Sequence, residues 1–458
     1  MKRQALLGGL GALALACSST TGSPSPAASA SPSAAPAASD WLTYQGGADR
    51  RGVGPASPTF GAPKPAWTAN VDGALYAQLL VAGNVVVAAT ENDSVYGFDS
   101  KSGRQLWRVH LGEPVAGDSL PCGNISPSGI TGTPVIDAAT RTVYLVAFLQ
   151  PFHHELYALA LDTGAVRWHR SIDAPGAAPN THQQRSALTL AGGNLYVPYG
   201  GLLGDCGQYK GTVVGLKADG SGDLFSWTIA APREGGIWAP GGAALDAAGD
   251  LYVALGNAQP TGTFNYGNAV VRLDPVLKLK DYWAPRDWDA LNRSDTDVGS
   301  ITPAVLNGGL VFQSGKAGLG YLMHADHLGG VGGEAFSGRV CSGGAFGATA
   351  YAPPLLYVPC RGEGITAVKL GPDRFDTAWT GGGGAGNTPI LAYGRVWAIG
   401  GGQPGALLAY EPATGRQASR TSLNQVAPFA SPSAAGGRLY VPAWNQVIAF
   451  SAGAFNTG

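Results

Sequence analysis

The sequence has few charged residues and no stretch suited to nucleic-acid binding. Only 13% of its 458 residues are charged, and the formal net charge is −1. Its longest cluster of positive charge is the pair Arg50 and Arg51, directly after Asp49. Proteins that bind nucleic acid gather lysine and arginine on one surface. The composition therefore argues against nucleic acid as a partner.

Several other patterns are missing as well. Amphipathic helical periodicity is hard to find, and no CxxC or HxxxH spacing suggests a zinc site. A GxSxG nucleophile motif in a usable context is also lacking. The chain is instead rich in glycine and proline, with 70 Gly and 32 Pro among 458 residues. Because these residues favour turns and loops, the composition and the length of the chain predict a many-stranded all-β repeat fold.

The first 17 residues, MKRQALLGGLGALALAC, are built like a secretory signal, with Lys2 and Arg3 before an apolar run. That run is too short for a comfortable membrane-spanning helix. Residues 14–17 resemble the bacterial lipoprotein processing box, which implies that Cys17 carries a lipid; an ordinary cleaved signal is the alternative. We expect an exported protein of the cell envelope, anchored to the outer side of a membrane.

Residues 18–39 consist almost entirely of Ser, Ala, Pro, Thr and Gly. Such a segment has no side chains for a core and predicts a disordered tether. A single domain, residues 40–458, follows it. We expect this domain to be a monomer.

One phrase recurs along this domain. It reads SVYGFDSKSGRQLWR at residues 94–108 and ELYALALDTGAVRWHR at residues 155–170, with a weaker copy at 405–417. Each copy is a strand, an acidic turn with glycine, and a second strand that ends on an aromatic residue in the two clearest copies. The second strands carry the residues Trp67, Trp107, Trp168, Trp227, Trp283 and Trp379, with Phe336 and residues 417–421 in the two gaps. The spacing, roughly 50 residues, is that of a propeller blade.

An independent series of inner hairpins gives the same number of units. These hairpins begin near Gln78, Thr133, Ala187, Gly242, Ile301, Ala348, Thr388 and Pro432. The sequence therefore predicts an eight-bladed β-propeller of four-stranded antiparallel blades. The last blade lacks an outer strand, and we expect residues 64–71 to supply it and close the ring.

The phrase resembles the PQQ-like propeller repeat of the quinoprotein alcohol dehydrogenases. Its strongest marks are Asp99, Gly103 and Trp107, and then Asp162, Gly164 and Trp168. The resemblance implies that each tryptophan docks against the neighbouring blade near a glycine, as part of the core. A repeat of this kind specifies the architecture and not the chemistry.

Four cysteines remain after Cys17, an even number that suggests two disulfides in an exported chain. Sequence alone allows three pairings. In the propeller arrangement all four lie on one face, Cys341 and Cys360 in one blade and Cys122 and Cys206 in adjacent blades. We therefore expect the pairs Cys122–Cys206 and Cys341–Cys360, each fastening a long loop.

The loops that lead into the innermost strands, here called lead-in loops, should bring their last residues to the axis. The predicted ligand-binding residues are Gln78, Gln184, Arg185, Trp238, Asp297, Ser300, Phe346, Asn387 and Phe429. Arginine, acid and amides beside aromatics are typical of a small-ligand or peptide site, although a filled polar channel would look the same. No metal site is expected, because His153 and His154 are adjacent in a strand and point to opposite faces.

Two functions follow from this pattern. The first is a non-catalytic scaffold that binds a ligand or an envelope protein; one lipid-anchored propeller with this repeat assists outer-membrane β-barrel assembly without catalysis. The alternative is a dehydrogenase with pyrroloquinoline quinone (PQQ) and calcium at the axis, held by Arg185, Trp238, Asp297 and Asn387. Many quinoproteins carry adjacent cysteines below the cofactor, and no two cysteines are adjacent here. We therefore expect the scaffold, with no cofactor.

Overall fold

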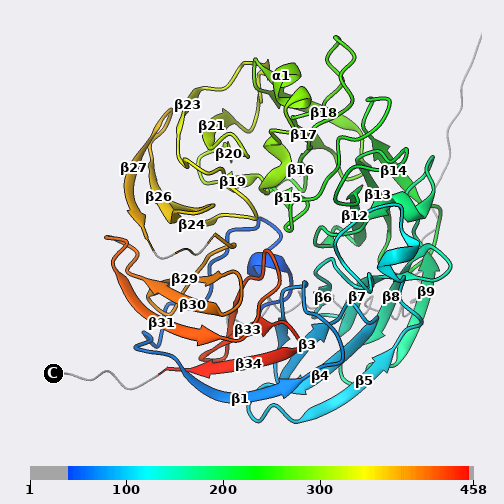
Figure 1. Cartoon of the computed structure of the whole chain (residues 1–458), viewed down its shortest axis with the longest axis vertical. Helices are drawn as coiled ribbons and strands as arrows, with labels where there is room; N and C mark the ends of the chain where they lie inside the picture. The colour runs from blue at the N-terminus through cyan, green and yellow to red at the C-terminus, as the bar shows by residue number, and fades with distance from the viewer. Residues whose placement is uncertain (1–39, 383, 385, 453–458) are drawn as a thin grey trace, which may run out of the picture. The chain divides into compact units, whose positions relative to one another are not determined.

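Eight antiparallel sheets surround a central axis as the blades of a β-propeller (Figure 1). The computed structural model describes residues 40–382, 384 and 386–452. The predicted signal (1–17), Cys17 and the predicted tether (18–39) lie outside the described residues. No helix among the described residues is long and apolar enough to cross a membrane. The predicted fold class is confirmed.

Each of the first four blades runs outward from the axis, in chain order. Blade 1 has β2 (Leu80–Ala82), β3 (Val85–Ala89), β4 (Ser94–Asp99) and β5 (Gln105–His110). Blade 2 has β6 (Val135–Asp137), β7 (Thr142–Leu149), β8 (His153–Ala160) and β9 (Val166–Ser171). Blade 3 has β10 (His182–Gln183), β11 (Thr189–Ala191), β12 (Asn194–Gly201), β13 (Thr212–Lys217) and β14 (Phe225–Thr228). Blade 4 has β15 (Ala244–Leu245), β16 (Leu251–Ala254), β17 (Val270–Leu273) and β18 (Leu279–Ala284), with β22 (Gly330–Val331) added in parallel at its edge.

The other four blades follow the same plan. Blade 5 has β19 (Ala304–Leu306), β20 (Leu310–Gln313), β21 (Leu319–His324) and β23 (Phe336–Arg339). Blade 6 has β24 (Ala350–Ala352), β25 (Leu355–Cys360), β26 (Gly364–Leu370) and β27 (Phe375–Gly381). Blade 7 has β28 (Ile390–Ala392), β29 (Arg395–Gly400), β30 (Gly405–Tyr410) and β31 (Gln417–Leu423). Blade 8 has β32 (Ser433–Ala435), β33 (Arg438–Ala443), β34 (Gln446–Ser451) and β1 (Lys64–Asn70). Short helices η1 (Tyr44–Gly46), η2 (Gly117–Ser119), η3 (Pro179–Thr181), α1 (Trp288–Arg293) and η4 (Val298–Ser300) lie in connections.

The burial of the strands explains their composition. Every residue of β3, with the sequence VVVAA, is buried, because an inner strand is covered by a neighbouring blade on each side. The outer strand β5 keeps Trp107 buried and exposes Gln105, Arg108 and His110. Continuous apolar runs therefore mark inner strands, and alternation marks outer ones.

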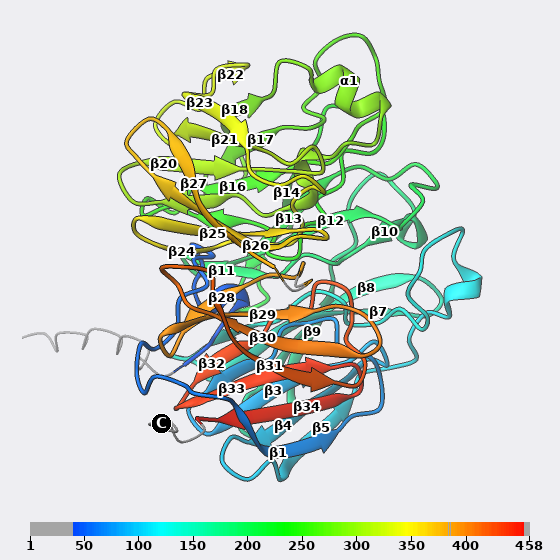
Figure 2. The same cartoon turned by 60° about the vertical axis from the view of Figure 1, so that its left-hand side comes forward.

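The N-terminal strand closes the ring. β1 pairs antiparallel with β34, from Lys64 opposite Ser451 to Asn70 opposite Gln446. Figure 1 shows the blue β1 beside the red β34, and Figure 2 shows the same pair from the side. Blade 8 thus gains its fourth strand from the start of the chain, as predicted.

The repeated tryptophans join neighbouring blades, as the resemblance implies. Trp107 of blade 1 donates Nε1–H to the Leu161 carbonyl of blade 2 at 2.9 Å. Its ring covers Gly164, which has a φ of +69°, and a Cβ there would lie 2.5 Å from the indole. Only glycine fits that place without rearrangement. Similar contacts join Trp67 with Gly103 and Trp379 with Gly415.

The axial channel is filled by a segment that we call the plug, residues 41–52, which the sequence analysis did not predict. The backbone of the plug bonds to inner strands of several blades, through Val81, Ile136, Leu245, Tyr351 and Leu391. In Figure 1 this blue segment lies at the centre of the ring. The channel is therefore closed between the two faces of the propeller.

Arg50 anchors the plug. Its guanidinium is 1% exposed and donates to the carbonyls of Tyr44, Leu188 and Ala243 and to the hydroxyls of Thr43 and Thr189, at 2.6 to 3.1 Å. Burial lowers the pKa of this arginine to about 10, so it stays charged at neutral pH. Hydrogen bonds from all three nitrogens offset the cost of burying that charge.

Both predicted disulfides are present. Cys122 and Cys206 join lead-in and connecting loops of blades 2 and 3, with Cα atoms 6.2 Å apart. Cys341 and Cys360 join the loops around blade 6, with Cα atoms 5.3 Å apart. The two bonds fasten loops on the same face of the ring.

Candidate functional site

Six of the nine predicted residues gather at one end of the axis, above the plug. They are Arg185, Trp238, Asp297, Phe346, Asn387 and Phe429. All six come from lead-in loops. We call the region that they surround the axial mouth.

Gln78 lies at the same level but uses its side chain within the protein. Its Oε1 accepts from Trp41 Nε1 (3.1 Å) and from the Gln45 amide (2.8 Å), both in the plug. Its Nε2 donates to Ser431 Oγ (3.1 Å) and the Pro432 carbonyl (2.8 Å). Gln78 therefore ties the plug to blade 8 and has little capacity left for a ligand.

Gln184 and Ser300 are also buried and bonded to backbone. Gln184 Nε2 donates to the Ser186 carbonyl at 2.6 Å, and Ser300 Oγ donates to the Ala345 carbonyl at 2.7 Å. These contacts fix the course of two lead-in loops. A ligand contact by either residue remains a prediction.

Three aromatic rings form the wall of the axial mouth. The Trp238 ring centroid lies 6.4 Å from that of Phe346 and 6.3 Å from that of Phe429. Phe429 has a φ of +66°, an uncommon backbone conformation for a bulky residue. The lead-in loop of blade 8 is thereby bent so that this ring faces the axis.

A cation rests on each of these rings. The cation-to-centroid distances are 4.4 Å for Arg185 on Phe429, 5.6 Å for Lys316 on Trp238 and 5.4 Å for Arg361 on Phe346. An aromatic face attracts a cation without carrying a charge of its own. The rings therefore hold the cations in place without neutralising them. Lys316 is also paired with Asp295 and Asp297, whereas Arg185 and Arg361 have no ion pair with any described residue.

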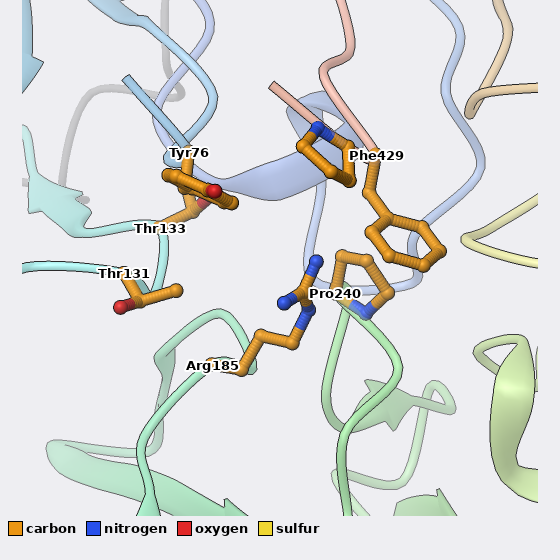
Figure 3. A pocket seen from close by; sticks show the side chains of 7 residues that line it. Tyr76, Thr131, Thr133, Arg185, Pro240 and Phe429 are labelled. Atoms are coloured by element: carbon orange, nitrogen blue, oxygen red, sulfur yellow. The ribbon is translucent and has the colours of Figure 1, made fainter. Parts of the chain in front are cut away.

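Arg185 points into a small cavity, the inner chamber (Figure 3). This cavity has a volume of about 10 Å³ and is lined by Tyr76, Thr131, Thr133, Arg185, Pro240, Pro428 and Phe429. It has room for one water-sized particle. The guanidinium makes no ion pair and no hydrogen bond to any described residue, and its Nε is buried. Burial lowers the pKa of Arg185, while Tyr76 and Glu91 oppose that shift.

A larger cavity of about 380 Å³, the outer chamber, shares Pro428 and Phe429 with the inner one. Arg361 and Asn387 supply its polar side chains. Arg361 is exposed and has no carboxylate partner in the described part of the chain. The Nδ2 of Asn387 is buried and lacks an acceptor among the described residues. Both chambers thus present hydrogen-bond donors.

Asp297 was the one axial acid proposed for calcium. Its Oδ2 accepts from Lys316 Nζ at 2.7 Å, and its Oδ1 accepts from the Asn257 amide. The same ammonium lies 2.8 Å from Asp295. Lys316 therefore takes the place of a cation between these carboxylates, and a calcium ion does not fit beside it. No group of three His, Cys, Asp or Glu side chains that could hold a metal ion occurs in the described segments.

Two buried acids lie behind the inner chamber. Glu91 Oε2 accepts from the Gly129 amide (2.8 Å) and from Thr131 Oγ1 (3.1 Å). Burial raises the pKa of Glu91 to about 7, although Arg185 lowers it in part. Burial and the charge of Glu91 raise the pKa of Asp93 to about 9. The charge of the Glu91 carboxyl near Arg185 thus changes with pH around neutrality.

The sequence analysis missed Arg361, Lys316, Tyr76 and Thr131. Arg361 and Lys316 both lie in connections between the second and third strands of a blade, on the face of the lead-in loops. The sequence analysis used this kind of connection to place Cys206 and Cys360. Had it also considered the charged residues in these connections, it could have found Arg361 and Lys316.

Phe148, which packs with Cys122 and Cys206, separates the loops of these cysteines from the buried His154 on which it stacks. The Nδ1 of His154 lies 3.2 Å from Asp173 Oδ1, and its ring stacks on Phe148 with centroids 4.3 Å apart. His153 is not buried. These contacts give His154 a structural role under the loops.

The ring and its docking tryptophans define a class, the β-propellers with PQQ-like repeats. Residues 62–200 match the family model described as "Outer membrane protein assembly factor BamB". These residues run from the approach to β1 into β12. No curated protein has a sequence that matches the chain.

Solved structures show the same fold. Quinohemoprotein alcohol dehydrogenase ADHIIG from Pseudomonas putida HK5 has a TM-score of 0.70 and 13% identity, over 91% of this chain and 80% of that one. The quinohemoprotein alcohol dehydrogenase of Comamonas testosteroni has a TM-score of 0.65 and 15% identity, over 90% and 80%. BamB from Moraxella catarrhalis has a TM-score of 0.57 and 15% identity, over 87% and 99%. The chain is therefore a propeller of the PQQ and BamB type, and at these identities the likeness concerns the fold alone.

Proposed function

We propose that this protein is a non-catalytic binding protein whose axial mouth takes an acidic ligand. The observation that carries the proposal is Arg185, which has no hydrogen bond or ion pair with any described residue. An arginine placed deep in a protein is normally paired, because leaving its charge unpaired is costly. Arg50, in the plug, is paired in this way.

The chemistry of the mouth supports an anion. Guanidinium and amide N–H groups only donate hydrogen bonds, so Arg185, Arg361 and Asn387 Nδ2 call for acceptors. A carboxylate or phosphate supplies acceptors together with the opposite charge. The plug makes the mouth a dead end, so a ligand would enter and leave by the same face.

The dehydrogenase alternative has less support. It requires calcium beside Asp297, where the ammonium of Lys316 already lies 2.7 Å from the carboxylate. Trp238, a candidate floor for a flat cofactor, has Lys316 against its ring. The proposal accordingly includes no cofactor.

The proposal also places the protein outside the cytoplasm, as a monomer held to a membrane by a lipid on Cys17. The basic and apolar start of the sequence and the box at residues 14–17 support this placement. Intact-mass analysis of the expressed protein, with Cys17→Ala as the control, should show an added diacylglyceryl mass only when Cys17 is present. An unmodified Cys17 in the mature protein would contradict the anchor.

The binding proposal is tested by titration calorimetry in a chloride-free buffer, with acetate and sulfate as probes. We expect binding that Arg185→Met weakens about tenfold or more, the effect of losing a charged hydrogen bond. Arg374→Met is the matched control, because Arg374 also rests on an aromatic ring, Phe336, but is paired with Asp376.

Equal binding by wild type and Arg185→Met, or no binding of either probe, would overturn the proposal. PQQ is titrated in parallel, with and without calcium. Calcium-dependent binding of PQQ that survives Arg185→Met would favour the dehydrogenase instead.

A further inference from the structure

The axial mouth offers two separate places for negative charge, and this distinguishes it from a site for a single anion. Arg185 serves the inner chamber, while Arg361 and Asn387 serve the outer chamber. The two chambers are neighbours, since Pro428 and Phe429 line both. A ligand with an acidic group in each chamber would therefore meet donors at both ends.

The two chambers differ in size, which orients such a ligand. The inner chamber, at about 10 Å³, has room for about one oxygen atom of an acidic group. The outer chamber, at about 380 Å³, is comparable to the smaller sites that hold whole small molecules. One acidic group would thus reach Arg185, with the rest of the ligand in the outer chamber.

The aromatic rings are poorly placed to stack on a ligand. Phe429, Phe346 and Trp238 each have a cation against the ring at 4.4 to 5.6 Å. Trp238 also contacts the other two rings. Each ring thus already has one cation as a partner, and an aromatic ligand would have to compete with it for that face, so we expect the hydrogen-bond donors to dominate recognition.

Resting on the proposed function, we infer that the ligand class is a small aliphatic dianion, bound with one acidic group at Arg185 and the other at Arg361 and Asn387. Each guanidinium is already held by a ring, so little side-chain freedom is lost when the ligand binds. Short aliphatic dicarboxylates, such as succinate and glutarate, represent this class.

The test compares succinate and glutarate with butyrate, which has one carboxylate, and phthalate, which has two on an aromatic ring. We expect a dicarboxylate to bind about tenfold or more tightly than butyrate, since it gains a second charged contact. Arg361→Met should remove that advantage, so that it weakens the dicarboxylates about tenfold more than it weakens butyrate. Arg361→Lys, which keeps the charge but loses the fork of donors, should retain part of it.

The possible failures separate the two proposals. Butyrate and succinate binding equally, both weakened by Arg185→Met and neither by Arg361→Met, would overturn the dianion and leave the acidic-ligand proposal standing. Tighter binding of phthalate than of either aliphatic dicarboxylate would also overturn the inference. Arg361 is exposed, so its variants should fold; an unchanged melting temperature and the Arg374→Met control check this.

Discussion

Two arginines lie along the propeller axis, and their surroundings are opposite. Arg50 in the plug donates five hydrogen bonds and is 1% exposed. Arg185 in the axial mouth has a phenylalanine ring 4.4 Å away and no hydrogen-bond acceptor among the described residues. The same type of side chain thus stabilises the fold in the plug and stays available for a ligand in the axial mouth. A buried charge alone therefore does not mark a binding site; a charge without partners does.

Arg50→Met should have the largest effect on stability. The change leaves three carbonyls and two hydroxyls without their donor, so we expect a loss of about 3 kcal/mol or more in the free energy of unfolding. Denaturant unfolding measures it, with the exposed Arg420→Met on β31 as the control. A stability equal to that of wild type would mean that the plug is not anchored by Arg50.

Glu91→Gln should change how stability depends on pH. The carboxyl has a pKa of about 7 when folded and 4.5 as its ordinary value. A raised carboxyl pKa stabilises the fold below the ordinary value, and that stability is lost as pH rises through 7. Relative to the glutamine variant, wild type should lose up to about 3 kcal/mol between pH 4.5 and 7. Parallel pH curves for the two proteins would contradict the assignment.

Tyr44→Phe should have a moderate effect at the plug. Tyr44 Oη donates to Thr388 Oγ1 at 2.9 Å, and burial raises the pKa of Tyr44 to about 12. Losing this bond should cost about 1 kcal/mol of unfolding free energy. Tyr282→Phe, which removes a hydroxyl without a described partner, is the control. Equal effects of the two changes on the free energy of unfolding would show that the hydrogen bond to Thr388 does not stabilise the fold.

Arg185→Met should have the smallest effect on stability. It removes ring contacts and no described hydrogen bond, so the free energy of unfolding should change by about 1 kcal/mol or less. The same denaturation measurement as for Arg50→Met makes the comparison direct. Destabilisation as large as that of Arg50→Met would show that Arg185 stabilises the fold. The two arginines would then not differ in the way described above.

Much of the fold could be predicted from the sequence because each propeller blade is formed by residues that are close together in the sequence and follow a repeated pattern. The hairpins and the docking tryptophans, such as Trp107 with Gly164, lie within single repeats or between consecutive ones. The missing strand of blade 8 pointed to β1, and the positions of the loops in the ring indicated the cysteine pairs. Each of these inferences needed only the repeat and its geometry.

The plug could not be predicted, for a physical reason. Residues 41–52 lack strand alternation, and their partners are scattered over the chain, from Val81 to Leu391. The axial mouth was partly foreseen, since the ends of lead-in loops must meet at the axis. Which of its side chains are paired was not foreseeable, because the partners of Gln78 come from the plug and from blade 8, far away in the sequence.

The position of the plug and of β1 also bears on the order in which the chain can fold during synthesis. Both belong to the first residues of the domain to leave the ribosome. Yet Gln45 bonds to the carbonyl of Pro389, and β1 pairs with β34 at the other end of the chain. Contacts between residues so far apart in sequence form slowly. The N-terminal segment can contact blade 1 early, through Val81, but its full set of partners exists only after the last blade has been made.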